Sequence, residues 1–208
     1  MSYAYTEVTS LDDWDETAWN RCLTESWSSL QTSMDWNAVI GVFLRQSTGD
    51  PDLTINHTDY TDAQKKNYLW QYVRNGVTSQ NHMVMYLWKD AHIVHILLCN
   101  IERDETEGNT LSINFFLAGR DASGNKAYLE TEVNTQRRAF RQFVRQDAYD
   151  IKNVQIKLCN VANAHRMAQH YNRHYKNASS VQSYEETSTD SGGSTRTCLL
   201  YTSPSPRD

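Results

Sequence analysis

The residues best suited to chemistry gather in the second half of the chain. His170 and His174 stand four residues apart, a spacing that places two imidazoles on one face of a helix, where they could chelate a metal ion. A metal site usually needs a third ligand and outer partners as well, and the surrounding segment offers no Asp, Glu or Cys. We therefore expect solvated histidines here and predict no metal site.

Basic residues concentrate in the same part of a chain whose formal net charge is -5. They belong to two expected helices and are Arg137, Arg138, Arg141, Arg145, Arg166, Arg173 and Lys176. Solvated helix faces account for most clusters of this kind, and a phosphate-bearing ligand or nucleic acid is the alternative. Because an acidic chain is a poor candidate for binding nucleic acid or anionic membranes in bulk, we expect neither partner.

The cysteines and apolar runs indicate the compartment. Cys22, Cys99 and Cys159 are widely spaced and form no Cys-x-x-Cys pair, a pattern typical of reduced thiols rather than of a disulfide or zinc framework. The longest apolar runs fall far short of the roughly 20 residues that span a bilayer, and no signal peptide is recognised at the start. We expect a cytoplasmic protein with no membrane segment.

Hydrophobic periodicity predicts the elements that position these residues. Apolar residues recur at helical spacing in three segments, 12–30, 35–45 and 63–74. Ser10 predicts the N-cap of the first helix, and Gly76 predicts the stop of the third. A short strand over residues 3–8 is expected to precede them.

At His82 the pattern changes to a period of two. Residues 82–88 are apolar or aromatic on both faces, which is typical of a strand buried on both sides. With 93–101 and 111–117 they predict an antiparallel three-stranded meander. The remaining expected elements are a helix to about residue 150, a strand over 154–158, a helix over 161–175 and a strand over 181–185. We predict that the 111–117 and 154–158 strands are parallel neighbours, because the intervening helix makes a right-handed crossover.

In this order the predicted elements resemble the GCN5-related N-acetyltransferases, the GNAT family, over nearly all of residues 3–185. The resemblance implies a mixed α/β (α+β) fold of three layers, with a mixed, mostly antiparallel central sheet flanked by helices. It also implies an acyl-CoA-dependent N-acyltransferase, which binds acetyl-CoA and transfers the acyl group directly to an amine of a small molecule or protein.

The family resemblance also points to a cofactor loop. Family members open the helix after the meander with Gln/Arg-x-x-Gly-x-Gly/Ala, whose backbone amides hold the pyrophosphate of acetyl-CoA. Here the segment 120–127 has an Arg, a Gly and an Ala in that order but at a different spacing, and Asp121 adds a carboxylate that repels phosphate. The resemblance thus implies a degenerate loop with candidate cofactor-binding residues Arg120, Ser123, Gly124, Asn125 and Lys126. A plain β-turn of Asp-x-x-Gly type is the alternative.

Two candidate catalytic residues follow from the same resemblance. The family carries an Asn, an Ala and a Tyr on its last helix, and the Tyr protonates the departing thiolate; Asn163, Ala164 and Tyr171 stand in that neighbourhood, one residue out of register. Packing in the core is the other interpretation of Tyr171. Glu102, just after the second strand of the meander, would deprotonate the amine through a water, or it is simply an exposed loop residue.

A second class of function is non-catalytic. Tailed bacteriophages encode virion or internal core components of GNAT-like architecture, and the Asp-Ala-Ser-Gly-x-Lys turn at 121–126, followed by Tyr128, is similar to these. That resemblance implies other virion proteins as partners, and the host cytoplasm or the virion as the location.

The end of the chain differs from the rest. We expect one domain over residues 1–185, and the Ser/Thr/Gly-rich residues 186–197 have too few apolar side chains to order themselves. Residues 198–208 (CLLYTSPSPRD) resemble the translated read-through of a sequencing adapter. We therefore expect a metagenomic sequence whose native part was cut at or near Thr197, and we predict no stable packing from residue 186 onward.

Overall fold

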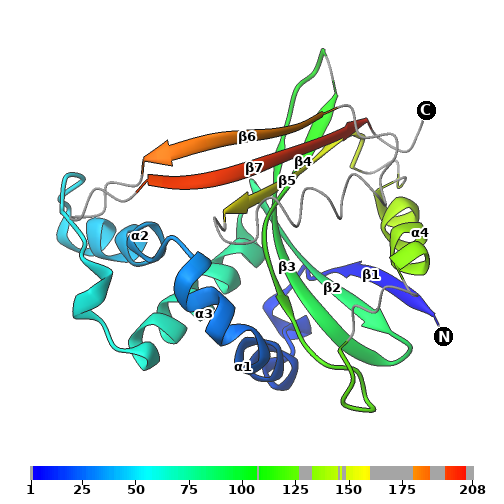
Figure 1. The fold of residues 1–208 in the computed structure, drawn as a ribbon, viewed down its shortest axis with the longest axis horizontal. Helices are drawn as coiled ribbons and strands as arrows, with labels where there is room; N and C mark the ends of the chain where they lie inside the picture. The colour runs from blue at the N-terminus through cyan, green and yellow to red at the C-terminus, as the bar shows by residue number, and fades with distance from the viewer. Residues whose placement is uncertain are drawn as a thin grey trace.

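The computed structural model describes residues 2–106, 108–126, 133–144, 146, 149–159, 180–187 and 195–204. Its strands form one seven-stranded sheet in the order β1-β2-β3-β4-β5-β7-β6 (Figure 1). Of the described pairs, β4 with β5 is parallel and the others are antiparallel. The predicted fold class, a mixed and mostly antiparallel sheet flanked by helices, is confirmed.

The strands are β1 (Tyr3–Glu7), β2 (His82–Lys89), β3 (His92–Glu102), β4 (Asn109–Ala118), β5 (Ile151–Cys159), β6 (Ser180–Thr187) and β7 (Thr195–Pro204). The described α-helices are α1 (Glu16–Ser33), α2 (Trp36–Thr48), α3 (Asp62–Thr78) and α4 (Val133–Val144), with short 3-10 turns η1 (Leu11–Asp13) and η2 (His57–Asp59). The helix expected over 161–175, which carries Tyr171 and the histidine pair, lies outside the described residues.

The first helix begins later than the sequence predicts. Ser10 accepts a hydrogen bond from the amide of Asp12 and therefore caps only η1. Asp15 is the N-cap of α1, with its carboxylate accepting from the amide of Ala18 at 2.8 Å. The hydroxyl of Tyr86 on β2 accepts from the amide of Asp15 at 2.8 Å, so the sheet itself fixes where α1 starts.

Gly76 does not end α3 as predicted but lies inside it. A Cβ at this position would stand 2.8 Å from Cδ1 of Leu98, a buried residue of β3. The glycine is needed for the close approach of α3 to the sheet. By contrast, Gly49 is the C-cap of α2 with φ +70°, a left-handed conformation that glycine adopts without strain.

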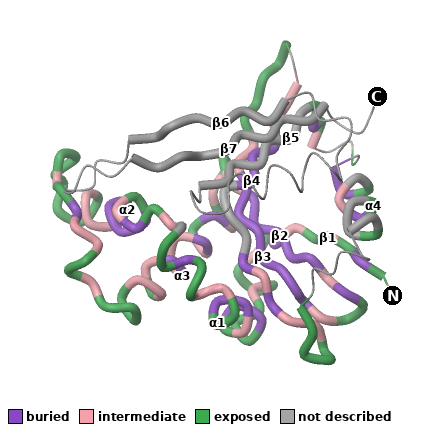
Figure 2. The backbone as a smooth tube through the Cα atoms, viewed as in Figure 1, coloured by how far each residue is buried: buried purple, intermediate pink, exposed green. Residues whose placement is uncertain are grey.

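Two apolar cores lie on opposite faces of the sheet (Figure 2). One core joins α1, α2 and α3 to Val84, Tyr86 and Leu98. The other joins α4 to Met83, Met85 and Leu87. Successive residues of β2 enter opposite cores, as the two-sided pattern of this segment predicts. Burial of a leucine in either core stabilises the fold by about 1.5–3 kcal/mol.

The predicted meander and crossover are also confirmed. β2, β3 and β4 pair consecutively and antiparallel, with Asp90 at φ 54° in the turn between β2 and β3. Leu111 on β4 stands opposite Val154 on β5 in a parallel ladder, with α4 in the connection.

The C-terminal part differs from the expectation of no packing after residue 186. β7 pairs with β5 on one side and with β6 on the other, so Thr195–Pro204 occupies an interior place in the sheet. The segment is rich in Thr and contains Cys-Leu-Leu-Tyr, a composition that fits a strand better than a loop. The adapter origin of residues 198–208 stays a prediction.

Candidate active site between two diverging strands

Two neighbouring strands separate in the middle of the sheet. The parallel ladder between β4 and β5 runs from Asn109 opposite Ile151 to Ile113 opposite Ile156. Beyond this point β4 continues to Ala118 beside β3, whereas β5 continues to Cys159 beside β7. The sheet therefore opens toward the carboxyl ends of β4 and β5.

A β-bulge explains the separation. Leu98 and Cys99 of β3 stand opposite Phe115 and Ile113 of β4, so Asn114 is an extra residue on β4. A bulge bends its strand and increases the local twist. Because Asn114 follows the last residue that pairs with β5, the bend turns β4 away from β5, and no strand of the described ranges pairs with this edge of β4 beyond Ile113.

Helix α1 holds the far end of β4. The hydroxyl of Ser26 donates to the carbonyl oxygen of Ala118 and accepts from its amide, both at 2.9 Å. A Cβ on Gly119 would lie 2.8 Å from Sγ of Cys22, so only glycine allows α1 this close. Burial raises the pKa of Cys22 to about 11, which keeps it an unreactive thiol. The part of β4 that no described strand joins on the β5 side therefore begins at Asn114 and reaches the contact of Ala118 with Ser26.

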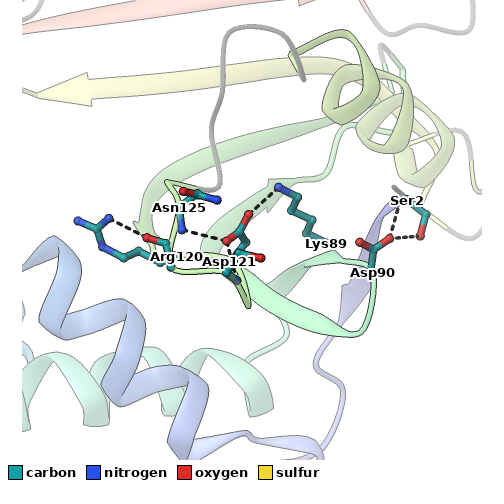
Figure 3. Close-up of polar contacts among 8 residues, drawn as sticks. Ser2, Lys89, Asp90, Arg120, Asp121 and Asn125 are labelled. Carbon is teal, nitrogen blue, oxygen red and sulfur yellow. Dashed lines mark hydrogen bonds and ion pairs between the residues drawn. The ribbon is translucent and has the colours of Figure 1, made fainter.

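The loop after β4 contains the predicted cofactor residues and folds around Asp121 (Figure 3). Oδ1 of Asp121 accepts from the amides of Ser123 at 3.0 Å and Asn125 at 2.9 Å. The amide of Gly124 donates to the carbonyl oxygen of Asp121 at 2.9 Å, and Gly124 has φ +79°. The β-turn of Asp-x-x-Gly type, the alternative to a phosphate loop, is thus present, with its amides bound to Asp121.

An ion pair anchors this turn to the sheet. Nζ of Lys89, the last residue of β2, lies 2.8 Å from Oδ2 of Asp121, and the two side chains are only 8% and 10% exposed (Figure 3). The Lys89 ammonium is the main cause of the lowered pKa of Asp121, followed by the amide of Asn125. The carboxylate therefore stays ionised within the turn.

The two basic candidates of the loop differ in their contacts. Nε of Arg120 pairs with Oε1 of Glu25 on α1 at 2.9 Å, and its Nη1 donates to the carbonyl oxygen of Gly124 at 3.0 Å. Lys126 is exposed, and its backbone bridges to that of Arg120. The guanidinium that was expected to bind phosphate thus already has two oxygen partners.

The candidate catalytic residues do not join this loop in the described structure. Glu102 ends β3 opposite Thr110, is exposed, and lies at the paired end of β4. Four residues separate Thr110 from Asn114, or about 13 Å along an extended strand. Tyr171 lies outside the described residues. The structure brings together the five cofactor candidates but places Glu102 away from them.

Several residues near the loop were not predicted from the sequence. Lys89 occupies the same face of β2 as buried Met83, Met85 and Leu87, so the period of two already placed a lysine at a core position. That signal was enough to suggest a buried ion pair. Glu25 and Ser26 have no comparable signal, because polar residues are ordinary on a helix.

His95 is a further buried polar residue beside the site. It stands opposite Leu87 on β2 and opposite Ala118 at the end of β4. Burial lowers its pKa to about 4, so the imidazole is neutral at physiological pH. Within the described ranges, no group of three or more His, Cys, Asp or Glu residues is placed to hold a metal ion.

Comparison with known proteins gives similarity in fold. No protein-family model matches the chain, and no curated protein does. A solved acetyl transferase from Salmonella typhimurium, which modifies the N-terminal serine of 50S ribosomal protein L7/L12, has 11% identity and a TM-score of 0.54, covering 98% of this chain and 95% of that one.

Two further solved structures are similar at lower TM-scores. The acetyltransferase of the GNAT family from Streptococcus pneumoniae has 14% identity and a TM-score of 0.39, covering 81% of this chain and 93% of that one. The N-acetyltransferase PseH from Campylobacter jejuni, in complex with acetyl coenzyme A, has 9% identity and a TM-score of 0.47, covering 97% and 98%.

The chain has the fold of the GNAT acetyltransferases, as the element order predicts. The phage origin finds no support in these matches. Among the residues that the structure describes, no helix is both long and apolar enough to cross a membrane.

Proposed function

We propose that this chain is an acyl-CoA-dependent N-acyltransferase that holds its thioester in the opening between β4 and β5. The observation that carries the proposal is the separation of these strands at the Asn114 bulge, in a chain with the GNAT fold. An extended acyl-pantetheine chain can pair with the backbone of β4 where β5 has left it.

The chemistry is direct acyl transfer. The amine attacks the thioester carbonyl, a C–N bond forms and the C–S bond breaks. A general base removes the proton from the amine, and a general acid protonates the departing thiolate. Backbone N–H groups at the edge of β4 are the available donors for the oxygen that becomes negative during the attack.

The family resemblance assigns protonation of the thiolate to Tyr171 and deprotonation of the amine to Glu102. For Glu102 this requires a chain of waters, since it lies about 13 Å along the strand from the bulge. We therefore compare Glu102→Gln with Glu105→Gln, a matched change of an exposed glutamate in the following loop. If Glu102 is the base, its variant lowers kcat at least about tenfold and removes the acidic limb of the pH profile, and the Glu105 variant does neither.

The test of the proposal is binding and turnover. Calorimetry with acetyl-CoA at millimolar concentration should show binding. When a panel of small amines and peptides with free N-termini is added, the chain should acetylate at least one of them and release free CoA thiol. Absence of binding to acetyl-CoA refutes the proposal.

The alternative is a non-catalytic protein with the same fold. The observation in its favour is the turn at 121–125, where Asp121 already accepts from the amides that a cofactor pyrophosphate would need. Binding of acetyl-CoA without turnover of any amine, or no binding at all, favours this alternative.

A further inference from the structure

The turn after β4 has the donors of an anion site, and the chain fills that site with its own carboxylate. Asp121 receives the amides of Ser123 and Asn125 on one oxygen and the ammonium of Lys89 on the other. Successive backbone amides with a lysine are the groups that proteins use to hold phosphate. Any phosphate at this point must compete with a carboxylate that belongs to the same loop.

Two features hold the carboxylate in place. Lys89 is buried at the end of β2, and its Nζ lies 2.8 Å from Oδ2 of Asp121, so the ammonium is held beside this carboxylate. Asp121 is also close in sequence to its amide partners, which makes its effective concentration high. Displacing this carboxylate would leave a negative charge beside the incoming phosphate.

The cation at the start of the loop, Arg120, is neutralised separately. Arg120 pairs with Glu25 of α1 at 2.9 Å. Lys89 at the end of β2 and Arg120 after β4 therefore each have a carboxylate partner, Asp121 of the turn and Glu25 of α1. The exposed Lys126 is the positive charge of the loop for which the structure shows a backbone bridge only.

We propose that Asp121 excludes pyrophosphate from this loop and thereby determines which thioesters the chain accepts. An acyl thioester is then held by its acyl-pantetheine end between β4 and β5, and its phosphates contribute nothing. This inference rests on the proposed acyltransferase function, and it names the specificity of the same site.

The direct test uses inorganic pyrophosphate as the probe. Asp121→Ala removes the carboxylate from the two amides and from the Lys89 ammonium, and we expect its affinity for pyrophosphate to exceed that of the unmodified chain at least about tenfold, as for two or three charge-assisted hydrogen bonds. The matched control is Asp104→Ala, because Asp104 likewise accepts the amide of the residue two positions on, Thr106, but is exposed. The control should bind pyrophosphate no better than the unmodified chain.

A second variant keeps the test valid if Asp121→Ala does not fold. Asp121→Asn keeps an acceptor for the two amides but removes the negative charge, so it should fold and bind pyrophosphate more tightly than the unmodified chain by a smaller factor. If Asp121→Ala is unfolded under the conditions of the binding measurement, the pyrophosphate affinity of Asp121→Asn tests the inference. Equal pyrophosphate affinity in the unmodified chain and in the folded Asp121 variants overturns the inference.

The substrate test compares acetyl-CoA with S-acetylpantetheine, which lacks all phosphates. In the unmodified chain kcat/KM should be similar for the two thioesters, and in Asp121→Ala it should favour acetyl-CoA about tenfold or more. A strong preference of the unmodified chain for acetyl-CoA that Asp121→Ala does not increase also overturns the inference. If neither thioester binds or reacts, the proposed function fails, and the pyrophosphate titration still decides the role of Asp121.

Discussion

Ser26→Ala tests whether α1 holds the open end of β4. The Ser26 hydroxyl makes two hydrogen bonds of 2.9 Å to the backbone of Ala118. Each is worth about 0.5–1.5 kcal/mol net, and the better helix propensity of alanine returns about 0.5 kcal/mol. We expect the free energy of unfolding to fall by about 0.5–2.5 kcal/mol, which lowers Tm by roughly 2–8 °C for a chain of this size.

The assay is urea unfolding followed by tryptophan fluorescence, with Ser28→Ala as the control. Ser28 is an exposed serine of the same helix, so its replacement changes helix propensity without touching β4. Ser26→Ala should unfold at lower urea than Ser28→Ala, with an unchanged slope. If the two variants have the same midpoint, Ser26 does not stabilise the end of β4 and the description of α1 as its support is wrong.

Two more predictions concern a close contact and a charge. Gly76→Ala should lower the free energy of unfolding by about 1 kcal/mol, since crowding against buried Leu98 costs about 1–3 kcal/mol and exceeds the gain in helix propensity. In the control Gly41→Ala the new Cβ would meet the guanidinium end of Arg45, whose Nε donates to the carbonyl oxygen of Leu53, and calorimetry should show a smaller loss of stability than for Gly76→Ala. Lys89→Met should raise the pKa of Asp121, measured by carboxyl NMR, because the ammonium is the main cause of its lowering. A carboxyl group whose pKa is lowered in the folded state stabilises the fold above pH of about 4, and this stabilisation is lost as the pH falls through the folded pKa. The stability of Lys89→Met should therefore fall less than that of the unmodified chain on acidification below pH of about 4. Equal acid sensitivity of the two would contradict the ion pair.

Much of the fold was predictable because buried faces of helices and strands require apolar residues at regular spacings in the sequence. The two-sided pattern of β2 and the pairing of Leu111 beside Val154 follow from strand geometry and crossover handedness. Helix starts were less predictable, because Ser10 and Asp15 are both good N-caps and the hydrogen bond from Asp15 to Tyr86 selects between them. The sequence also does not show whether Gly76 ends a helix or allows the helix to approach the sheet closely.

The candidate site was predictable in outline only. The segment 120–126 stood out by its composition, but the role of Asp121 depends on Lys89, which is 32 residues away in sequence. The bulge at Asn114 leaves no residue-level signal, since any residue can be the extra one in a bulge of this kind. Contacts between distant segments therefore set the chemistry of the site, and single-sequence patterns do not record them.

The separation of the two cores by the sheet has a consequence for how the chain tolerates change. The buried residues under α1, α2 and α3 and those under α4 form two separate clusters, so the effects on stability of well-separated substitutions in the two should add. The exceptions are residues of the central strands, since Val84 and Met85 of β2, and likewise Leu98 and Cys99 of β3, belong to opposite cores from adjacent backbone positions. The two helical layers can therefore diverge largely independently in sequence, and β2 and β3 are strands through which a change in one layer constrains the other.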